Sequence, residues 1–437
     1  MEQNASSDQA LTSGAESSLP ESTDAERDET ALSMMSHAGQ MHRQDRLPKE
    51  FKKALIATIT WCLLQLFKHF GFSINLWVSA FIDLAVGLVI IQVACQAIIA
   101  GTERLAARFK WDQYVAGTWS EILSTLPEIV VVAFLVPVNP FLAFTMVMIT
   151  IYNNSLVFSC YSFFLPKDVK GKYLMPKPIT EVGTQILVAG GSLGLIMGAM
   201  MLGLVVTKVD VQGFNNVDLI FIAMVLLLLF VIYMYRLTVF YATDDSKKKT
   251  PSGTQKLKFK LDLIEIYQAV QRRSWATIIG LFFIGVGGSF LGGVSVNDFA
   301  VIMTQELNVD AFITAFFLAA FGGMSEYVIL LNAHRRKDYG IALANAFGGM
   351  TQVMFLILPF TLLFGAYYSL MYSPAQSSWL VFNTASILLF AFLFPTFYTL
   401  TALLEEDHTF DLLDTAVMVS IVTILIYLLM SYGNGVN

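Results

Sequence analysis

Two glutamates, Glu128 and Glu326, stand in the middle of apolar stretches that are long enough to cross a membrane. A carboxylate at that depth costs roughly 3 kcal/mol on insertion scales, so it is seldom kept for packing alone. Each glutamate follows residues that weaken a helix. Pro127 has no backbone N–H and leaves the Leu123 carbonyl without its usual partner, and two glycines precede the second glutamate. A carboxylate beside a freed carbonyl offers hard oxygen ligands to a cation.

The two glutamates belong to an internal repeat. The segments WDQYVAGTWSEILSTLPEIVV and VDAFITAFFLAAFGGMSEYVI align without a gap at an offset of 198 residues. This offset pairs the glutamates with each other, and 26 residues after each of them it pairs Asn154 with Gln352. Each half therefore offers one carboxylate and one side-chain amide, and we predict that the two sets form one cation site.

Further residues near the glutamates extend this predicted site. Additional polar ligands are Asn153, Thr125 and Ser325. A second group contains Glu121, the Leu123 carbonyl, and the helix-opening or close-packing glycines Gly322, Gly323, Gly348 and Gly349. Glu121 lies two turns before Glu128 on about the same face, where it either extends the ion path or forms part of a structural pair. The structural alternatives are protonated, hydrogen-bonded glutamates and glycines that serve helix packing only.

The composition predicts where these residues lie. Hydrophobic residues make up 56% of the 437 residues and charged ones 14%, against about 45–50% and about 25% in soluble domains. A water-soluble globular protein is therefore excluded. The apolar stretches predict an all-α polytopic membrane protein with eleven crossings, near residues 54–71, 76–106, 113–137, 139–165, 180–206, 217–241, 275–305, 310–334, 339–371, 378–403 and 412–431.

Lysine and arginine cluster in alternate loops, which predicts a cytoplasmic N-terminus. Because each half has an odd number of crossings, the second half must be inserted upside down relative to the first. The predicted organisation is a disordered cytoplasmic tail (1–50), a lead transmembrane helix (51–75), a first five-helix repeat (76–242), a cytoplasmic linker (243–270) and a second, inverted five-helix repeat (271–437).

Other functions find little support in the residues. The basic clusters fall in short loops, where they indicate topology and not nucleic-acid binding. The cysteines Cys62, Cys95 and Cys160 form no CxxC pair and are interpreted as packing residues. We predict no catalytic residue and no resident cofactor. An intramembrane protease is the alternative from another functional class, but the chain has no HExxH motif and no convincing Ser/His set.

The two repeats resemble those of the calcium/cation antiporter superfamily. GGMSEYVILLNAHRRKDYGIALANAFGGMTQVMFLILP is similar to the second repeat of the cation/proton exchangers at Glu326, Gly348, Gly349, Thr351, Gln352 and Pro359. The residues from Ser124 to Glu128 are similar to the TSLPE element of the sodium/calcium exchangers. The resemblance covers about residues 76–432. It departs where Thr150 and Ile151 replace a Gly-Ser pair of the family.

This resemblance implies a secondary antiporter that exchanges Ca²⁺ or a similar cation for H⁺ by alternating access, through sliding of the two leading helices of the repeats. Na⁺/Ca²⁺ exchange is the nearest alternative. The implied partners are inorganic cations and the lipid bilayer, while a homo-oligomer is left open. Compact loops favour a bacterial inner membrane, and a vacuole-like organelle membrane is the alternative.

Overall fold

The computed structural model describes residues 75–109, 122–167, 169, 171–207, 213–241, 275–335, 337, 339–372 and 380–432, with short pieces between 55 and 70. Within these ranges eight helices are long and apolar enough to cross a membrane, and two shorter apolar helices accompany them. These ten coincide with ten of the predicted crossings, and the lead helix is described only in pieces. The protein is therefore the all-α polytopic membrane protein that the sequence predicts. The tail (1–50) and the whole linker (243–270) lie outside the described residues.

The first half contains five helices with almost uninterrupted apolar sequence. They are α3 (Leu76–Phe109), α5 (Leu126–Val138), α6 (Pro140–Phe163), α7 (Thr184–Val206) and α8 (Asn216–Tyr241). A π-helical turn (η2, Ile179–Gly183) leads into α7. The start of α6 has a clear local cause, because the Asn139 side chain accepts a hydrogen bond from the Leu142 N–H at 3.0 Å and Pro140 occupies the first turn.

The second half repeats this order, and four of its five described crossings consist of more than one helical element. Its elements are α11 (Trp275–Val301) with η3 (Ile302–Glu306), α12 (Ala311–Gly322) with α13 (Met324–Arg335), α14 (Tyr339–Gln352) with η4 (Val353–Ile357) and α15 (Leu358–Tyr372), α16 (Thr384–Ala391) with α17 (Leu393–Asp407), and α18 (Leu412–Tyr432). Asp310 begins α12, since its carboxylate accepts from the Phe312 N–H at 2.8 Å.

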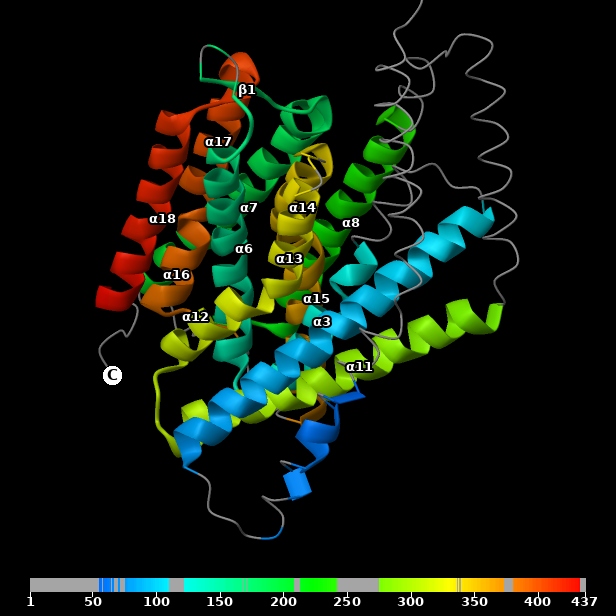
Figure 1. Cartoon of the computed structure of the whole chain (residues 1–437). Coiled ribbons are helices and arrows are strands. Elements are labelled where there is room, and N and C mark those ends of the chain that lie inside the picture. Colours follow the sequence, from blue (N-terminus) through cyan, green and yellow to red (C-terminus); the bar gives the residue numbers. More distant parts are fainter. Residues whose placement is uncertain are drawn as a thin grey trace, which may run out of the picture. The chain divides into compact units, whose positions relative to one another are not determined.

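The first helices of the two halves, α3 and α11, lie side by side along their length (Figure 1). Glycines permit this close approach. A Cβ placed on Gly292 would lie 2.5 Å from Ile91 Cγ1, and one on Gly285 would lie 2.3 Å from Ile98 Cγ1. The remaining contacts also correspond between halves, since α6 packs against α18 as α15 packs against α8.

Two short strand pairs join the halves. β1 (Tyr173–Leu174) pairs antiparallel with β4 (Thr409–Phe410), and β2 (Gly213–Phe214) pairs antiparallel with β3 (Leu380–Val381). β1 precedes α7 and β2 follows it, so the pairs lie at opposite ends of that helix. β1 and β3 occupy equivalent places in the two halves, and so do β2 and β4. The β1–β4 pair therefore corresponds to the β3–β2 pair when the halves are exchanged, as an inverted repeat requires.

An ion pair accompanies the first strand pair. Lys172, next to β1, donates to the Asp407 carboxylate, and the hydrogen bond to this carboxylate raises the pKa of the lysine above its usual value. The acidic loop after α17 therefore lies at the same end of the bundle as the lysine-rich loop after α6.

Candidate cation site

Glu128 lies in the first turn of α5, directly after a break in the helical crossing. Residues 122–124 form one helical turn, and Thr125 is a turn residue between it and α5. The Glu128 N–H donates to the Thr125 carbonyl at 3.1 Å, as expected where Pro127 cannot donate. The Thr125 hydroxyl, predicted as a ligand, donates to the Ile122 carbonyl at 2.8 Å.

The Leu123 and Ser124 carbonyls, which lie at this break, differ in their hydrogen-bond partners. Pro127 has no N–H to give to the Leu123 carbonyl, as the sequence indicates. The neighbouring Ser124 carbonyl accepts from the Cys95 thiol of α3 at 3.6 Å, a contact that the sequence did not predict. This buried cysteine, interpreted from sequence as a packing residue, therefore also links α3 to the break in front of α5.

Glu326 holds the equivalent position in the second half. Gly322 ends α12, Gly323 forms the turn, and Glu326 lies in the first turn of α13. Both glutamates therefore stand at the N-terminal end of a half-helix, where the aligned backbone N–H groups interact favourably with a negative charge.

The structure brings the two carboxylates together. Glu128 is only 8% exposed, and the glutamates lie close enough for their charges to repel each other. Glu128 Oε2 has no hydrogen-bond partner among the described residues. Two neighbouring carboxylates, one buried and one half-buried, are costly unless protons or a cation neutralise them.

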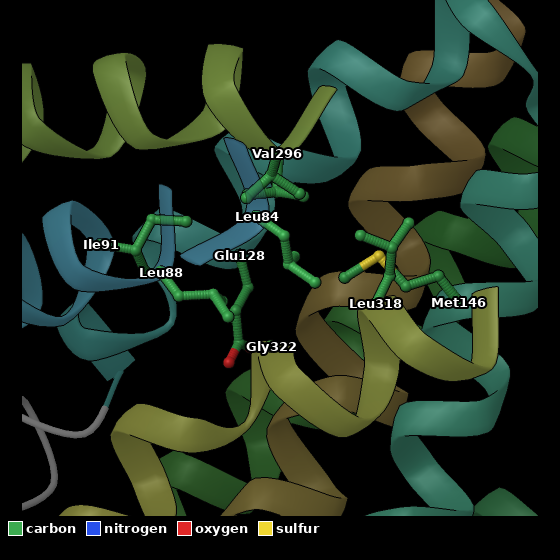
Figure 2. A pocket seen from close by; sticks show the side chains of 9 residues that line it. Leu84, Leu88, Ile91, Glu128, Met146, Val296, Leu318 and Gly322 are labelled. Atoms are coloured by element: carbon green, nitrogen blue, oxygen red, sulfur yellow. The ribbon is translucent and has the colours of Figure 1, made fainter. Parts of the chain in front are cut away.

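A small cavity adjoins Glu128. Its volume is about 20 Å³, enough for one water-sized particle. Figure 2 shows Glu128 reaching toward Gly322, where the second-half crossing is interrupted. Apart from Glu128 and Gly322 the lining is aliphatic or thioether, from Leu84, Leu88, Ile91, Val131, Met146, Val296 and Leu318.

Asn154 and Gly349 complete the part of the site around Glu326. A Cβ on Gly349 would lie 2.7 Å from Asn154 Nδ2 and 2.8 Å from Glu326 Oε2. The missing side chain at position 349 therefore makes room for the amide and the carboxylate together. Asn154 is 2% exposed, and its Oδ1 accepts no hydrogen bond within the described part of the chain, so this oxygen can face a cation.

The other predicted residues lie elsewhere or have other contacts. Asn153 turns its N–H groups toward the Ala319 carbonyl, at 3.5 Å, and the Tyr327 hydroxyl. Gln352 is buried at the end of α14, three residues after Gly349. The Gly348 carbonyl accepts from Thr351 at 3.0 Å. Glu121 lies outside the described residues, as does the side chain of Ser325.

Sequence reasoning did not predict two contacts around Glu326. The Asn345 amide donates to the Glu326 carbonyl at 3.2 Å, and Tyr327 bonds to Asn153. No three His, Cys, Asp or Glu side chains in the described ranges come together as a metal cluster. A cation between the glutamates would therefore complete its shell with amide, backbone or water oxygens.

Comparison with known proteins found a matching family model and solved structures with a similar fold. Residues 273–434 match the family described as sodium/calcium exchanger protein. A crystal structure of the H⁺/Ca²⁺ exchanger CAX superposes with a TM-score of 0.61 at 12% identity, covering 87% of this chain and 88% of that one. The second half of this chain is therefore similar to that family, and the chain as a whole has the fold of that solved exchanger.

The sodium-calcium exchanger NCX_Mj is also similar to this chain, with a TM-score of 0.49 at 18% identity, covering 80% of this chain and 98% of that one. No curated protein matches the chain. The matching family is one of ion exchangers, which move ions and do not transform a substrate.

Proposed function

We propose that this protein is a secondary antiporter that exchanges Ca²⁺ or a similar cation for H⁺ by alternating access. One observation carries the proposal. Two half-helices, one from each half of the chain, carry Glu128 and Glu326 in their first turns, and Glu128 reaches toward Gly322 at the break before the second of them. A pair of carboxylates of this kind can be neutralised either by one divalent cation or by protons. The cation-bound and the protonated pair would be the two transported states of the exchanger.

Competition at this pair gives the coupling. A divalent cation between the carboxylates favours their ionised forms, whereas repulsion between the empty carboxylates favours uptake of a proton. Cation and proton therefore exclude each other. The Asn154 Oδ1 atom would add a neutral ligand, and Ca²⁺ takes about six to eight oxygen ligands in all.

Movement of α3 and α11 would open the glutamate pair to one side of the membrane and then to the other. Both helices contribute to the wall of the cavity beside Glu128, through Leu84 and Leu88 of α3 and Val296 of α11. A shift of this closely packed pair along α5 would change the covering of the carboxylate without disturbing the α3–α11 contact.

Na⁺/Ca²⁺ exchange is the second candidate. The matching family is described by sodium/calcium exchange, and the residues before Glu128 resemble that branch. Dependence of Ca²⁺ flux on a Na⁺ gradient, with no effect of a pH gradient, would favour this alternative.

The proposed location is a bacterial inner membrane with a cytoplasmic N-terminus. The alternating lysine and arginine clusters support this orientation. Pairing of β1 with β4 agrees with the predicted alternation of the loops, because it puts the acidic segment at the end of α17 at the same end of the bundle as the lysine-rich loop after α6.

The test is Ca²⁺ uptake into proteoliposomes under an imposed pH gradient, with and without Na⁺. We expect uptake driven by the pH gradient alone, and its reduction by at least 100-fold, about 3 kcal/mol, in Glu128→Gln and Glu326→Gln. The matched control is Glu306→Gln, which changes an exposed glutamate at the end of η3 and should retain the wild-type rate. Coupled transport that survives in both site variants would refute the role of the pair.

A further inference from the structure

Tyr327, the residue after Glu326, is folded back over the break between α12 and α13. Its N–H donates to the Gly323 carbonyl at 3.1 Å. A Cβ on Gly323 would lie 2.8 Å from the Tyr327 hydroxyl oxygen and 2.9 Å from Cζ. The phenol end therefore rests directly on the backbone of the break, and only glycine at position 323 leaves space for it.

Asn153 of α6 holds the phenol in this place. Its Nδ2 group donates to the Tyr327 hydroxyl and also faces the Ala319 carbonyl at 3.5 Å. Because a carbonyl can only accept, the Asn153 atom that faces Ala319 must be the N–H donor. One amide thus binds both sides of the interrupted crossing, α12 through Ala319 and α13 through Tyr327.

The hydrogen bond from Asn153 determines that the Tyr327 hydroxyl can act as a donor to another group. Its oxygen accepts from Asn153, so its own proton remains to be donated. The Tyr327 hydroxyl oxygen rests on Gly323, the neighbour of Gly322, toward which Glu128 reaches (Figure 2). Glu128 Oε2 has no hydrogen-bond partner among the described residues, so a carboxylate oxygen on this side is open to a donor. A carboxylate is the strongest acceptor in such surroundings, and a hydrogen bond to it is charge-assisted.

We propose that Tyr327 is a positioning residue of the glutamate pair: Asn153 holds its hydroxyl, and the hydroxyl donates to a carboxylate and fixes the orientation in which the pair shares one cation. This inference rests on the proposed function and deepens it. Asn153 then acts through Tyr327 and is not a direct ligand, in contrast to the sequence-based prediction.

The test is equilibrium binding of ⁴⁵Ca²⁺ to the purified full-length protein, combined with uptake kinetics. Tyr327→Phe keeps the ring on Gly323 and removes only the hydroxyl. We expect it to raise the Kd and the KM for Ca²⁺ about tenfold, the effect of one charged hydrogen bond, with the maximal rate within about twofold of wild type. Asn153→Ala should do the same, and the double variant should be no weaker than either single one.

The matched control is Tyr152→Phe. Tyr152 precedes Asn153 on α6, but its hydroxyl donates to the Leu389 carbonyl of α16, so its loss should leave the Kd unchanged. If Tyr327→Phe does not fold, Asn153→Ala still releases the hydroxyl and carries the test. Wild-type Kd in Tyr327→Phe, or additive effects of the two substitutions, would overturn the inference alone. Absence of Ca²⁺ binding in the wild type would overturn the proposed function, and the inference with it.

Discussion

At the scale of single residues, the site depends on a position that has no side chain. A methyl group at Gly349 would enter the space of the Asn154 amide and the Glu326 carboxylate, at 2.7 and 2.8 Å. Overpacking of this kind costs about 1–3 kcal/mol. We therefore expect Gly349→Ala to weaken Ca²⁺ binding about tenfold or more, measured as the Kd of the purified protein.

Gly340 provides the control on the same helix. A Cβ there meets no atom within 4 Å, so Gly340→Ala tests the effect of a glycine-to-alanine change in α14 without crowding. Its Kd should equal that of the wild type. Unchanged binding in Gly349→Ala would mean that Asn154 and Glu326 can move apart without loss of the site.

The residues of the proposed charged centre stand out in the sequence more clearly than those around them. Glu128, Glu326 and Asn154 were recognisable because polar groups inside apolar helices are costly and therefore stand out. Tyr327 did not stand out, since tyrosine is common in membrane helices. Its contact with Asn153 joins residues 174 positions apart, and helices that are apolar all round give no periodicity that shows which face meets which neighbour.

At the scale of helices, we expect the contact between α3 and α11 to persist during transport and the contact between α11 and α5 to change. A Cβ on Gly87 of α3 would lie 3.1 Å from the Ser295 Cβ of α11, whereas one on Gly293 of α11 would lie 3.2 Å from Val130 Cγ1 of α5. If α3 and α11 move as a pair along α5, a disulfide between positions 87 and 295 should leave uptake unchanged. One between positions 293 and 130 should reduce it at least tenfold.

Each double-cysteine variant is made in a background without Cys62, Cys95 and Cys160, and uptake is measured after oxidation and again after reduction. Reduction should restore the activity of the α11–α5 variant, which separates the effect of the cross-link from that of the substitutions. Full activity in the oxidised α11–α5 variant would exclude sliding at this contact.

Helix breaks were predictable to within a few residues, and π-helical turns were not. Pro127 indicated a break before Glu128, and the structure has it at Thr125, because a proline affects the turn that precedes it. The glycine pair indicated the second break, which is at Gly323. The turn η4, directly after Gln352, has no sequence signal, so the direction of that amide could not be predicted.

At the scale of the whole molecule, the two strand pairs fix which loops share an end of the bundle. β1 pairs with β4 and β2 pairs with β3, and α7 separates the two pairs. Lysine counts alone left the loop after α17 ambiguous, because its charges are acidic and weigh little in the positive-inside rule. The strand pairing places this loop at the same end of the bundle as the loop after α6. Which side of the membrane that end faces stays a prediction.

Cysteine labelling tests that side. Thr384 and Glu406 are exposed at opposite ends of the crossing formed by α16 and α17, and Val169 is exposed near β1. In a cysteine-free background, a membrane-impermeant maleimide applied to right-side-out vesicles should label Thr384→Cys but neither Glu406→Cys nor Val169→Cys. Inside-out vesicles should give the reverse pattern. Labelling of Thr384→Cys and Glu406→Cys from the same side would show that α16 and α17 do not cross the membrane together. If each type of vesicle instead gave the pattern expected of the other, the fold would stand and the N-terminus would lie outside.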